Sequence, residues 1–425
     1  MRRISRLIVK NASVLVASAT LLAACDFLEV ADPGRYTDEA LNTPIALEAV
    51  ANGVENDVMT LVDDMALAQA LLSDEYMHSG TWTEWEAIDN GEGRPGNSSD
   101  YGVQLTMVQR RTAAQRAQER FRTVLGDSAN RTEIMARVIA TEAWSNLLLG
   151  MHNCESPPGP GEAPVSDVEM YRRSIPIFTR AIEIARAAQS PAYEQMALAG
   201  RARANLLAGN LDAAAADART LPDNFSYTAK FSDTPGPQNA IVTLTHPSRL
   251  KAGGLDQVHW GKIDTIAGFA RDPWTNQLDR RLKVSHPAGA RGADGTTPHF
   301  AEEKFTNVTD DILLTHGWEM RLIEAEVALR QNNLTLALQL INRVRANATL
   351  NAVSATTAAE VQRYLLWERF SQLFLEGHRA NDLARFNLAR DLGSNRATKF
   401  PLNTTELNLN SHTSGNTSGR CPSLT

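Results

Sequence analysis

Tryptophans and short polar side chains occur together in two segments of the sequence that lack apolar periodicity. The flat apolar face of an indole can stack on the C–H face of a sugar ring, and neighbouring carboxylates and amides can bond the sugar hydroxyls. Binding residues also concentrate in irregular segments that a rigid scaffold holds in place. We therefore predict a ligand-binding platform made of Trp82, Trp85, Asp89, Asn90, Trp274 and Asn276. The alternative is that each tryptophan only anchors its loop to the protein body.

No combination of residues is typical of an enzyme. None of the nine histidines belongs to an HExxH motif, and the chain has no GxSxG nucleophile elbow. Residues 91–96 match the letters of a dinucleotide-binding fingerprint, but no strand precedes them and a proline interrupts them. The acidic pairs at 63–64 and 74–75 are adjacent on helices, so their side chains point apart instead of facing a glycosidic bond. We interpret these pairs as solvated helix ends, and we expect no catalysis, cofactor or metal.

The composition limits the kind of protein. Of the 425 residues, 43% are hydrophobic and 21% are charged, as in a globular chain that forms two or three cores or one large helical array. The net charge of −7 offers no basic face for phosphates, so we do not expect nucleic-acid binding.

The first 24 residues have the features of a bacterial lipoprotein signal peptide. Four basic residues precede an apolar run at 12–24, which is shorter than the about 20 residues of a membrane-spanning helix. The run ends in Leu22-Ala23-Ala24-Cys25, which resembles a lipobox, and the Cys25 thiol can carry a diacylglyceryl thioether. We expect residues 25–425 to be a soluble mature chain that is tethered only by lipid. An ordinary secretory signal followed by an incidental cysteine is the alternative.

Two cysteines remain in the mature chain, Cys154 and Cys421. Export into an oxidising compartment permits a disulfide between them. The sequence does not place their Cα atoms within the about 7 Å that such a bond requires. A disulfide and two free thiols therefore both stay open.

Helical periodicity covers most of the chain outside the two irregular segments. Apolar residues at spacings of three and four predict helices at 44–72, 103–125, 133–151, 167–184, 312–347 and 357–392. Residues 73–101 carry the first two tryptophans of the platform and predict a loop. Residues 225–310 carry Trp274 and predict an irregular insertion with only brief strands, such as 241–245.

Two segments of the sequence repeat at an offset of 123 residues, which aligns Ala202 with Ala325 and Asn210 with Asn333. Each predicts a helix, a short turn containing asparagine, and a second helix. Paired small residues let two antiparallel helices pack closely, as in tetratricopeptide repeats. We predict an all-α dominated fold with a tetratricopeptide-like scaffold at about 133–222 and 312–392, and an irregular ligand-facing insertion at about 225–310. Two unrelated helical hairpins are the alternative.

Four parts of the chain, spread over nearly its whole length, resemble the SusD/RagB family of outer-membrane nutrient-uptake lipoproteins. They are residues 25–30 (CDFLEV) with 36–39 (YTDE), the helix at 318–346 with NRVR at 342–345, the ER…EGHRANDLAR pattern at 368–385, and PLNTTE at 401–406. The third part is the most specific. Its Glu376, Arg379, Asp382 and Arg385 recur every three residues, which places opposite charges beside one another on a helix. We interpret these charges as structural and expect a bend or a close approach at Gly377.

The resemblance implies a SusD-like fold and a function in nutrient uptake. Members of this family capture a nutrient, most often an oligosaccharide, for a SusC-like TonB-dependent β-barrel transporter. We therefore expect a lipid-anchored outer-membrane protein at the cell surface that binds an oligosaccharide or another small nutrient and is not an enzyme. The alternative is a tetratricopeptide-like lipoprotein scaffold that binds a protein or peptide and imports nothing. The irregular segments follow no motif that would name the ligand.

Replacing Cys25 with serine is expected to release the protein from membranes, because serine cannot form the thioether. Stable anchoring takes more than one acyl chain, at about 0.8 kcal/mol per buried CH₂, and a triacylated cysteine supplies this. Membrane fractionation of the C25S variant measures the release, and mass spectrometry of the wild-type protein identifies its N-terminus. An unmodified N-terminus at another residue would contradict the prediction.

Overall fold

The computed structural model describes residues 38–93, 96, 98–233, 237–245, 250–252, 263–264, 267–389, 392–393, 396–413 and 421. The predicted signal peptide and Cys25 lie outside these residues. The chain divides into two compact units, Met1–Ala46 and Leu47–Thr425. The described part of the first unit contains the short 3-10 helix η2 (Glu39–Leu41). No described helix combines the length and apolar character needed to cross a membrane.

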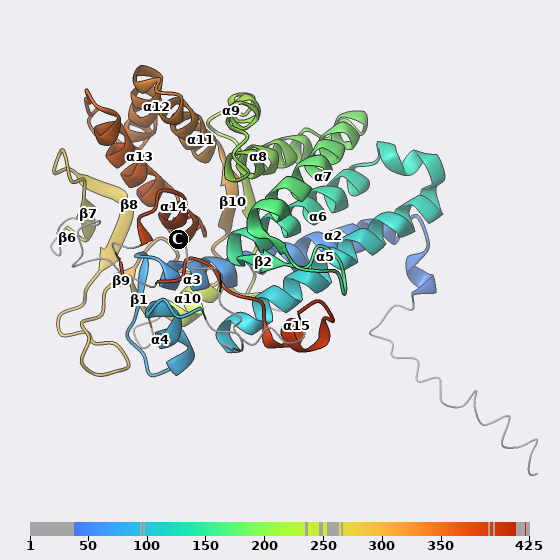
Figure 1. Ribbon diagram of the computed structural model, residues 1–425, viewed down its shortest axis with the longest axis horizontal. Coiled ribbons are helices and arrows are strands. Elements are labelled where there is room, and N and C mark those ends of the chain that lie inside the picture. Colours follow the sequence, from blue (N-terminus) through green and yellow to red (C-terminus); the bar gives the residue numbers. More distant parts are fainter. Residues whose placement is uncertain are drawn as a thin grey trace, which may run out of the picture. The chain divides into compact units, whose positions relative to one another are not determined.

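The second unit is mostly helical (Figure 1). Its first half contains α2 (Leu47–Met59), α3 (Val62–Leu72), α4 (Thr83–Asp89), α5 (Ser98–Leu125), η3 (Gly126–Arg131), α6 (Glu133–His152), α7 (Asp167–Ala187), α8 (Pro191–Leu207) and α9 (Leu211–Arg219). The helix predicted at 44–72 is therefore two helices, α2 and α3. Along α5, α6, α7 and α8, each helix packs against the next.

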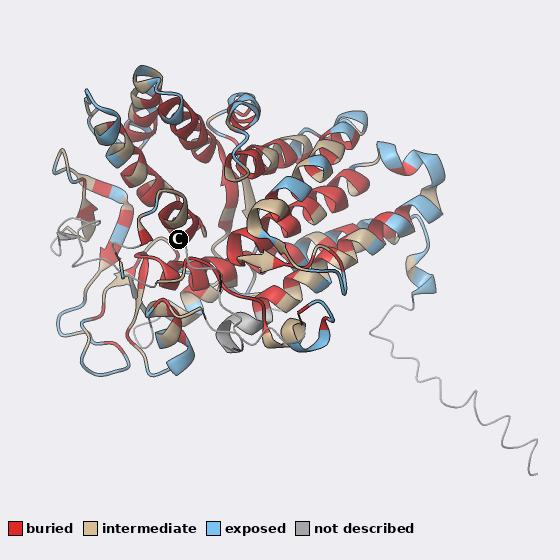
Figure 2. Cartoon of the chain, viewed as in Figure 1, coloured by how far each residue is buried: buried red, intermediate tan, exposed pale blue. Residues whose placement is uncertain are grey.

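Helix α6 forms the centre of this half and is buried along nearly its whole length (Figure 2). It is covered because α2, α5, α7 and α8 all pack against it. Its Trp144 is fully buried and meets Phe178 of α7 edge to face, with ring centroids 5.6 Å apart. A Cβ on Gly200 of α8 would lie 2.3 Å from the Phe178 ring, so only glycine permits this close approach.

The two predicted helical hairpins form at the predicted offset. The first is α8 and α9, and the second is α11 (Gly317–Arg330) and α12 (Leu334–Asn347). Their turns contain equivalent left-handed residues, Gly209 with φ +84° and Asn332 with φ +57°. The aligned Ala202 and Ala325 are fully buried, as close helix packing requires. Because α9 packs against α11, the hairpins join into one tetratricopeptide-like array.

Short antiparallel strands occur in the two segments predicted to be irregular and also outside them. β4 (Ser226–Ala229) pairs with β10 (Ile312–His316), β1 (Tyr76–His78) with β5 (Leu250–Ala252), and β2 (Glu155–Ser156) with β3 (Val165–Ser166). A four-stranded sheet has the order β6 (Ile263–Asp264), β7 (Phe269–Arg271), β8 (Leu278–Ser285), β9 (Ala301–Glu302).

Two predictions for this part are wrong. Residues 312–316 are strand β10 instead of the first turn of a helix, because they pair with β4. Residues 241–245 belong to a helix, α10 (Ala240–Thr245), instead of a strand. Its first N–H, that of Ala240, donates to the Asp63 carboxylate of α3 at 2.7 Å. This helix start therefore depends on a distant residue that the local pattern does not contain.

The helix predicted at 357–392 is broken into α13 (Ala358–Gln372) and α14 (Arg379–Arg385). Between them the backbone turns through Leu375 with φ +57° and Gly377 with φ +75°. The bend expected at Gly377 is therefore a complete turn of the chain, in a conformation that glycine adopts without steric cost. After α14, the described C-terminal segment contains the short helix α15 (Thr404–Leu409).

Cys154 and Cys421 form a disulfide, with their Cα atoms 5.6 Å apart. This settles the question that the sequence left open. Hydrogen bonds hold the nearby C-terminal segment at the end of α6: Lys399 Nζ donates to the Gly150 carbonyl at 2.8 Å, and Asn153 Nδ2 donates to the Pro401 carbonyl at 3.2 Å. The disulfide thus fastens a segment that polar contacts also keep in place.

Replacing Cys421 with serine is expected to lower the free energy of unfolding by about 2 to 5 kcal/mol, because the disulfide closes a loop with a sequence separation of 267 residues. Denaturant titration of the oxidised wild type and of the C421S variant measures the difference. As a control, a reducing agent should destabilise the wild type and leave C421S unchanged. Equal stability of the two oxidised proteins would contradict the prediction.

Candidate ligand-binding site

Trp82 is the only aromatic residue with an exposed side chain among the residues whose burial the structure describes, and 42% of it is exposed. It directly precedes α4, and its carbonyl accepts a hydrogen bond from the Glu86 N–H at 3.0 Å. The backbone that carries the indole is therefore part of the helix start. An indole in this position offers apolar area that a ligand can cover.

Polar groups from three segments lie near one another at the end of β1, a few residues before Trp82. The loop at 289–297 reaches the end of β1, where the Asp294 N–H donates to the Ser79 carbonyl at 3.0 Å. His78 is close enough to the Glu86 and Asp294 carboxylates for both to act on its pKa, although burial lowers that pKa overall. We call this group of residues, Trp82 with His78, Glu86 and Asp294, the Trp82 surface.

The Asp294 carboxylate is held in a fixed position. It accepts hydrogen bonds from the N–H groups of Thr296 and Thr297, both at 2.9 Å, and from the Thr297 hydroxyl. These bonds, that of the Thr297 hydroxyl most strongly, hold the pKa of Asp294 at about 2. The Trp82 surface therefore contains a carboxylate that is ionised throughout the physiological range. The sequence analysis missed this residue, since an Asp-Gly turn signal does not show which element the turn will approach.

The other residues predicted around Trp82 have structural contacts. Residues 83–89 are helical instead of a loop, because Trp85 and Ile88 are three apart and face the core together; Trp85 is only 8% exposed. The Asp89 carboxylate accepts a hydrogen bond from the backbone N–H of His78 at 2.9 Å, which holds α4 against β1. Asn90 ends α4 and donates its N–H to the Glu86 carbonyl at 2.9 Å.

Trp274 and Asn276 lie together in the turn between β7 and β8. The half-buried Trp274 ring packs edge-on against Tyr364 and Trp367 of α13, with centroids 4.7 and 6.0 Å away. Asn276 is exposed with φ +58°, and its N–H donates to the Asp272 carbonyl at 2.9 Å. The structure thus brings Trp82 together with Trp85, Asp89 and Asn90 at α4, and it places Trp274 and Asn276 in a separate hairpin against α13.

Most of the charged residues at 368–385 are buried, and Arg379 and Glu376 have partners in distant elements. The Arg379 guanidinium donates to both carboxylate oxygens of Asp74, at 2.6 and 2.7 Å. Glu376 accepts from Lys304 Nζ at 2.7 Å and lies 3.2 Å from His316 Nε2. The structural interpretation of these charges fits, but the expected pairing of Glu376 with Arg379 is wrong. The turn before α14 separates the two side chains, and each finds a partner elsewhere.

Arg369 of α13 forms a series of ion pairs with the remaining charged residues of α14. Arg369 donates to both oxygens of Asp382, at 2.7 and 2.9 Å. Asp382 also accepts from Arg385 at 2.6 Å, the one spacing of three that pairs as expected. Arg385 in turn contacts Glu326 of α11. Hydrogen bonds between ionised groups are strong, and a buried charge is costly when it lacks a partner. This series of ion pairs therefore fixes α14 against α11 and α13.

The interpretation of the acidic pairs as solvated helix ends is wrong for three of their four residues. Asp63, Asp74 and Glu75 are 3%, 3% and 1% exposed. Asp63 of α3 accepts a hydrogen bond from the first N–H of α10, and Asp74 pairs with Arg379. Glu75 accepts a hydrogen bond from the Leu375 N–H at 2.9 Å. Burial raises the pKa of Asp63 to about 7 and that of Glu75 to about 8. These carboxyls join distant parts of the fold.

Replacing Glu376 with glutamine is expected to destabilise the protein. Burial would raise the pKa of Glu376, but Lys304 and His316 outweigh it and hold the pKa at about 2, below the about 4.3 of an unfolded glutamate. Its stabilisation is therefore present above about pH 4.3 and lost as the pH falls toward 2. We expect E376Q to lower the free energy of unfolding at pH 7 by about 2 to 3 kcal/mol and to flatten its decrease below pH 5.

Denaturant titrations at neutral and acidic pH measure both effects of E376Q. The matched control is E183Q, which changes an exposed glutamate on α7 and should leave stability unaltered. Stability of E376Q equal to that of the wild type at pH 7 would show that the ion pairs of Glu376 contribute nothing to the fold.

Residues 319–418 match the model of the SusD family. This range begins in α11 and includes the turn at 373–378 and most of the charged residues described above. No curated protein matches the chain in sequence.

Solved structures of the SusD superfamily share the fold over most of the chain. A SusD superfamily protein from Parabacteroides distasonis has a TM-score of 0.66 at 13% identity and covers 89% of this chain and 98% of its own. One from Bacteroides vulgatus has a TM-score of 0.61 at 13% identity, covering 84% and 96%. A laminarin-binding SusD-like protein has a TM-score of 0.61 at 16% identity, covering 86% and 97%.

These findings confirm both the resemblance predicted from the sequence and the helical fold class. The family model matches the segment that carries the most specific motif. The structural similarity extends over the other elements, including the tetratricopeptide-like array. Residues 319–418 therefore resemble the SusD family in sequence, and the chain has a SusD-like fold.

Proposed function

We propose that the protein binds an oligosaccharide at the Trp82 surface and delivers it to a SusC-like TonB-dependent transporter. In this proposal the Cys25 lipid anchors it to the outer membrane at the cell surface. The observation that carries the proposal is the exposed indole of Trp82 at the start of α4, on a chain with a SusD-like fold. The protein acts by binding and performs no catalysis.

The chemistry of the Trp82 surface suits a sugar. The indole supplies a stacking face for the C–H side of a sugar ring. The Asp294 and Glu86 carboxylates can accept hydrogen bonds from sugar hydroxyls, and His78 offers a further polar group beside them. Support for a glycan also comes from the similar structures, since one is a laminarin-binding SusD-like protein and another a SusD-like carbohydrate-binding protein from Bacteroides vulgatus.

The residues of the predicted platform take different parts in this proposal. Trp82 contacts the ligand, while Trp85, Asp89 and Asn90 hold α4 in position beneath it. Asn276, which is exposed on the β7–β8 turn, is a candidate for a second contact, and Trp274 anchors that turn to α13. A long glycan could contact both segments, whereas a short one would contact only the Trp82 surface.

Replacing Trp82 with alanine is expected to weaken glycan binding by about 1 to 3 kcal/mol, because a few aromatic anchors usually dominate a binding site. The melting temperature should hardly change, since the ring is exposed. A glycan array probed with the mature chain identifies the ligand, and calorimetric titration of the wild type and W82A measures the affinity. W82A that is folded and binds the identified glycan with wild-type affinity would contradict the proposal.

The matched control is W274A. Its ring packs against Tyr364 and Trp367, so its loss should lower the melting temperature. The affinity of the folded fraction for a short glycan should stay unchanged. The protein-scaffold alternative predicts a different result, in which no glycan on the array binds the mature chain.

A further inference from the structure

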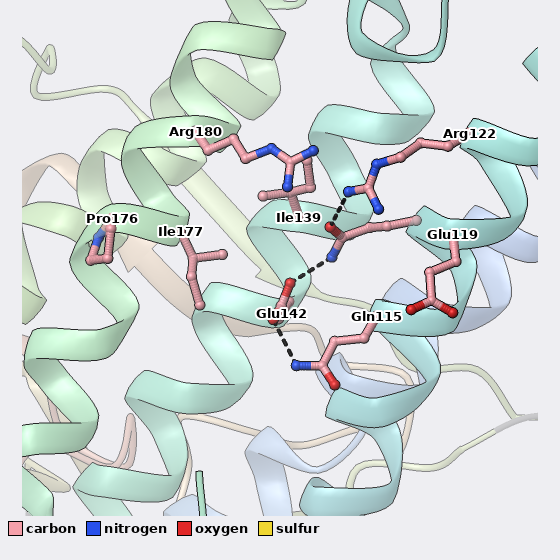
Figure 3. Close-up of a pocket in the computed structure, with 9 residues that line it drawn as sticks. Gln115, Glu119, Arg122, Ile139, Glu142, Pro176, Ile177 and Arg180 are labelled. Atoms are coloured by element: carbon pink, nitrogen blue, oxygen red, sulfur yellow. Dashed lines mark hydrogen bonds between the residues drawn. The ribbon is translucent and has the colours of Figure 1, made fainter. Parts of the chain in front are cut away.

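A cleft of about 420 Å³ opens between α5, α6 and α7 (Figure 3). It shares no residue with the Trp82 surface. Its lining residues are Gln115, Gln118, Glu119 and Arg122 from α5, Ile139 and Glu142 from α6, and Pro176, Ile177 and Arg180 from α7. The volume lies within the range of small-molecule sites, which bind a ligand through a few polar groups above an apolar floor.

The acidic group of the cleft is already bonded by neighbouring side chains. The two carboxylate oxygens of Glu142 accept hydrogen bonds from Gln115 Nε2 at 2.9 Å and from Gln118 Nε2 at 2.5 Å. The Gln118 carbonyl oxygen accepts from Arg122 Nη2 at 3.3 Å, which fixes the direction of its amide. Figure 3 shows these bonds as a continuous row across α5 and α6. Glu142 is therefore held in place and is not ion-paired with either arginine of the cleft.

The two arginines extend toward each other over the cleft, Arg122 from α5 and Arg180 from α7 (Figure 3). Among the described residues, Arg180 makes no hydrogen bond or ion pair. Burial lowers the pKa of Arg180, and the positive charge of Arg122 lowers it further, against the opposing effect of Glu142. Two like charges held this way repel each other, and an anion placed between them would relieve the repulsion.

The other residues of the cleft leave room for a compact organic body. Ile177 gives apolar surface above the fully buried Ile139, and Pro176 lies exposed in the middle of α7. Because proline has no N–H, it cannot donate a hydrogen bond to the carbonyl one turn before it. Its short ring also fills less of the cleft than a long side chain would. Glu119 is exposed, so water screens its charge.

We propose that this cleft binds a small organic oxyanion, a carboxylate or a phosphate ester, between the guanidinium groups of Arg122 and Arg180. A guanidinium presents paired N–H donors that match the oxygens of a carboxylate or phosphate, and the charge strengthens each bond. The apolar floor accepts the body of the ligand, and the polar row at Glu142 bonds its hydroxyl or amine groups. The site is independent of the glycan site proposed above, so either can fail alone.

The experiment uses citrate, galacturonate and glucose 6-phosphate as probes, with glucose as the neutral comparison, on the full mature chain. Ligand-observed NMR and calorimetric titration measure binding at millimolar concentration. We expect at least one of the three anions to bind and glucose not to compete with it. Binding of the carboxylates alone or of the phosphate ester alone identifies which oxyanion the cleft prefers.

Two variants, R122Q and R180Q, remove one charge each and keep a polar side chain of similar length. Each should weaken anion binding about tenfold or more, since one charge-assisted hydrogen bond is lost. The matched control is R116Q, which changes an exposed arginine on α5 outside the cleft and should leave anion binding unchanged. Circular dichroism confirms that all three variants are folded.

Three results would overturn the proposal. The first is that none of the three anions binds the wild type at millimolar concentration. The second is that the double variant R122Q/R180Q binds the anions as tightly as the wild type does. The third is an equal loss of binding in R116Q, which would mean that the anions respond only to the total charge of the surface.

Discussion

The buried ion pair between Arg379 and Asp74 is the constraint on which the placement of the Trp82 surface depends. The two residues are 305 positions apart and are 4% and 3% exposed. Removing both charges from water costs several kcal/mol, which only good geometry offsets, and here both guanidinium–carboxylate bonds are short. The adjacent Glu75 accepts the Leu375 N–H, so two neighbouring residues fix the end of α3 to the turn before α14. Strand β1 and then Trp82 follow directly, at a position that these bonds determine.

The same kind of contact connects the four-stranded sheet to the helical array. Arg345 of α12 is fully buried and donates to Asp272 and Glu368 at 2.8 Å each. Glu368 of α13 also accepts from Arg281 of β8 at 2.7 Å. Because an unpaired buried charge costs about 3 to 5 kcal/mol, any shift of β8 against α13 is penalised strongly. Paired charges therefore give short strands with little apolar surface a defined position.

The parts of the fold that could be predicted from the sequence are those with a local cause. The hairpins at Asn210 and Asn333 follow from apolar periodicity and a turn residue, and both form at the predicted offset. Ion-pair partners from distant elements could not be predicted. Glu376 pairs with Lys304, and it lies in a turn, next to Gly377, where the sequence pattern predicted a continuous helix. In the same way, the sequence does not distinguish Trp82 from Trp85, which lie three residues apart. Only the packing of α4 exposes one and buries the other.

The segment that matches the SusD family model and the proposed binding surfaces lie in different parts of the chain. The match covers residues 319–418, where buried ion pairs hold α11, α13 and α14 together. The residues of the Trp82 surface and of the α5–α7 cleft all lie before residue 319. Buried charges tolerate little change, since losing one partner leaves the other unpaired, whereas exposed residues usually change at small cost in stability. The segment of this chain that matches the family model is therefore the one whose buried charges hold the fold together, whereas both surfaces proposed to bind ligands lie outside it.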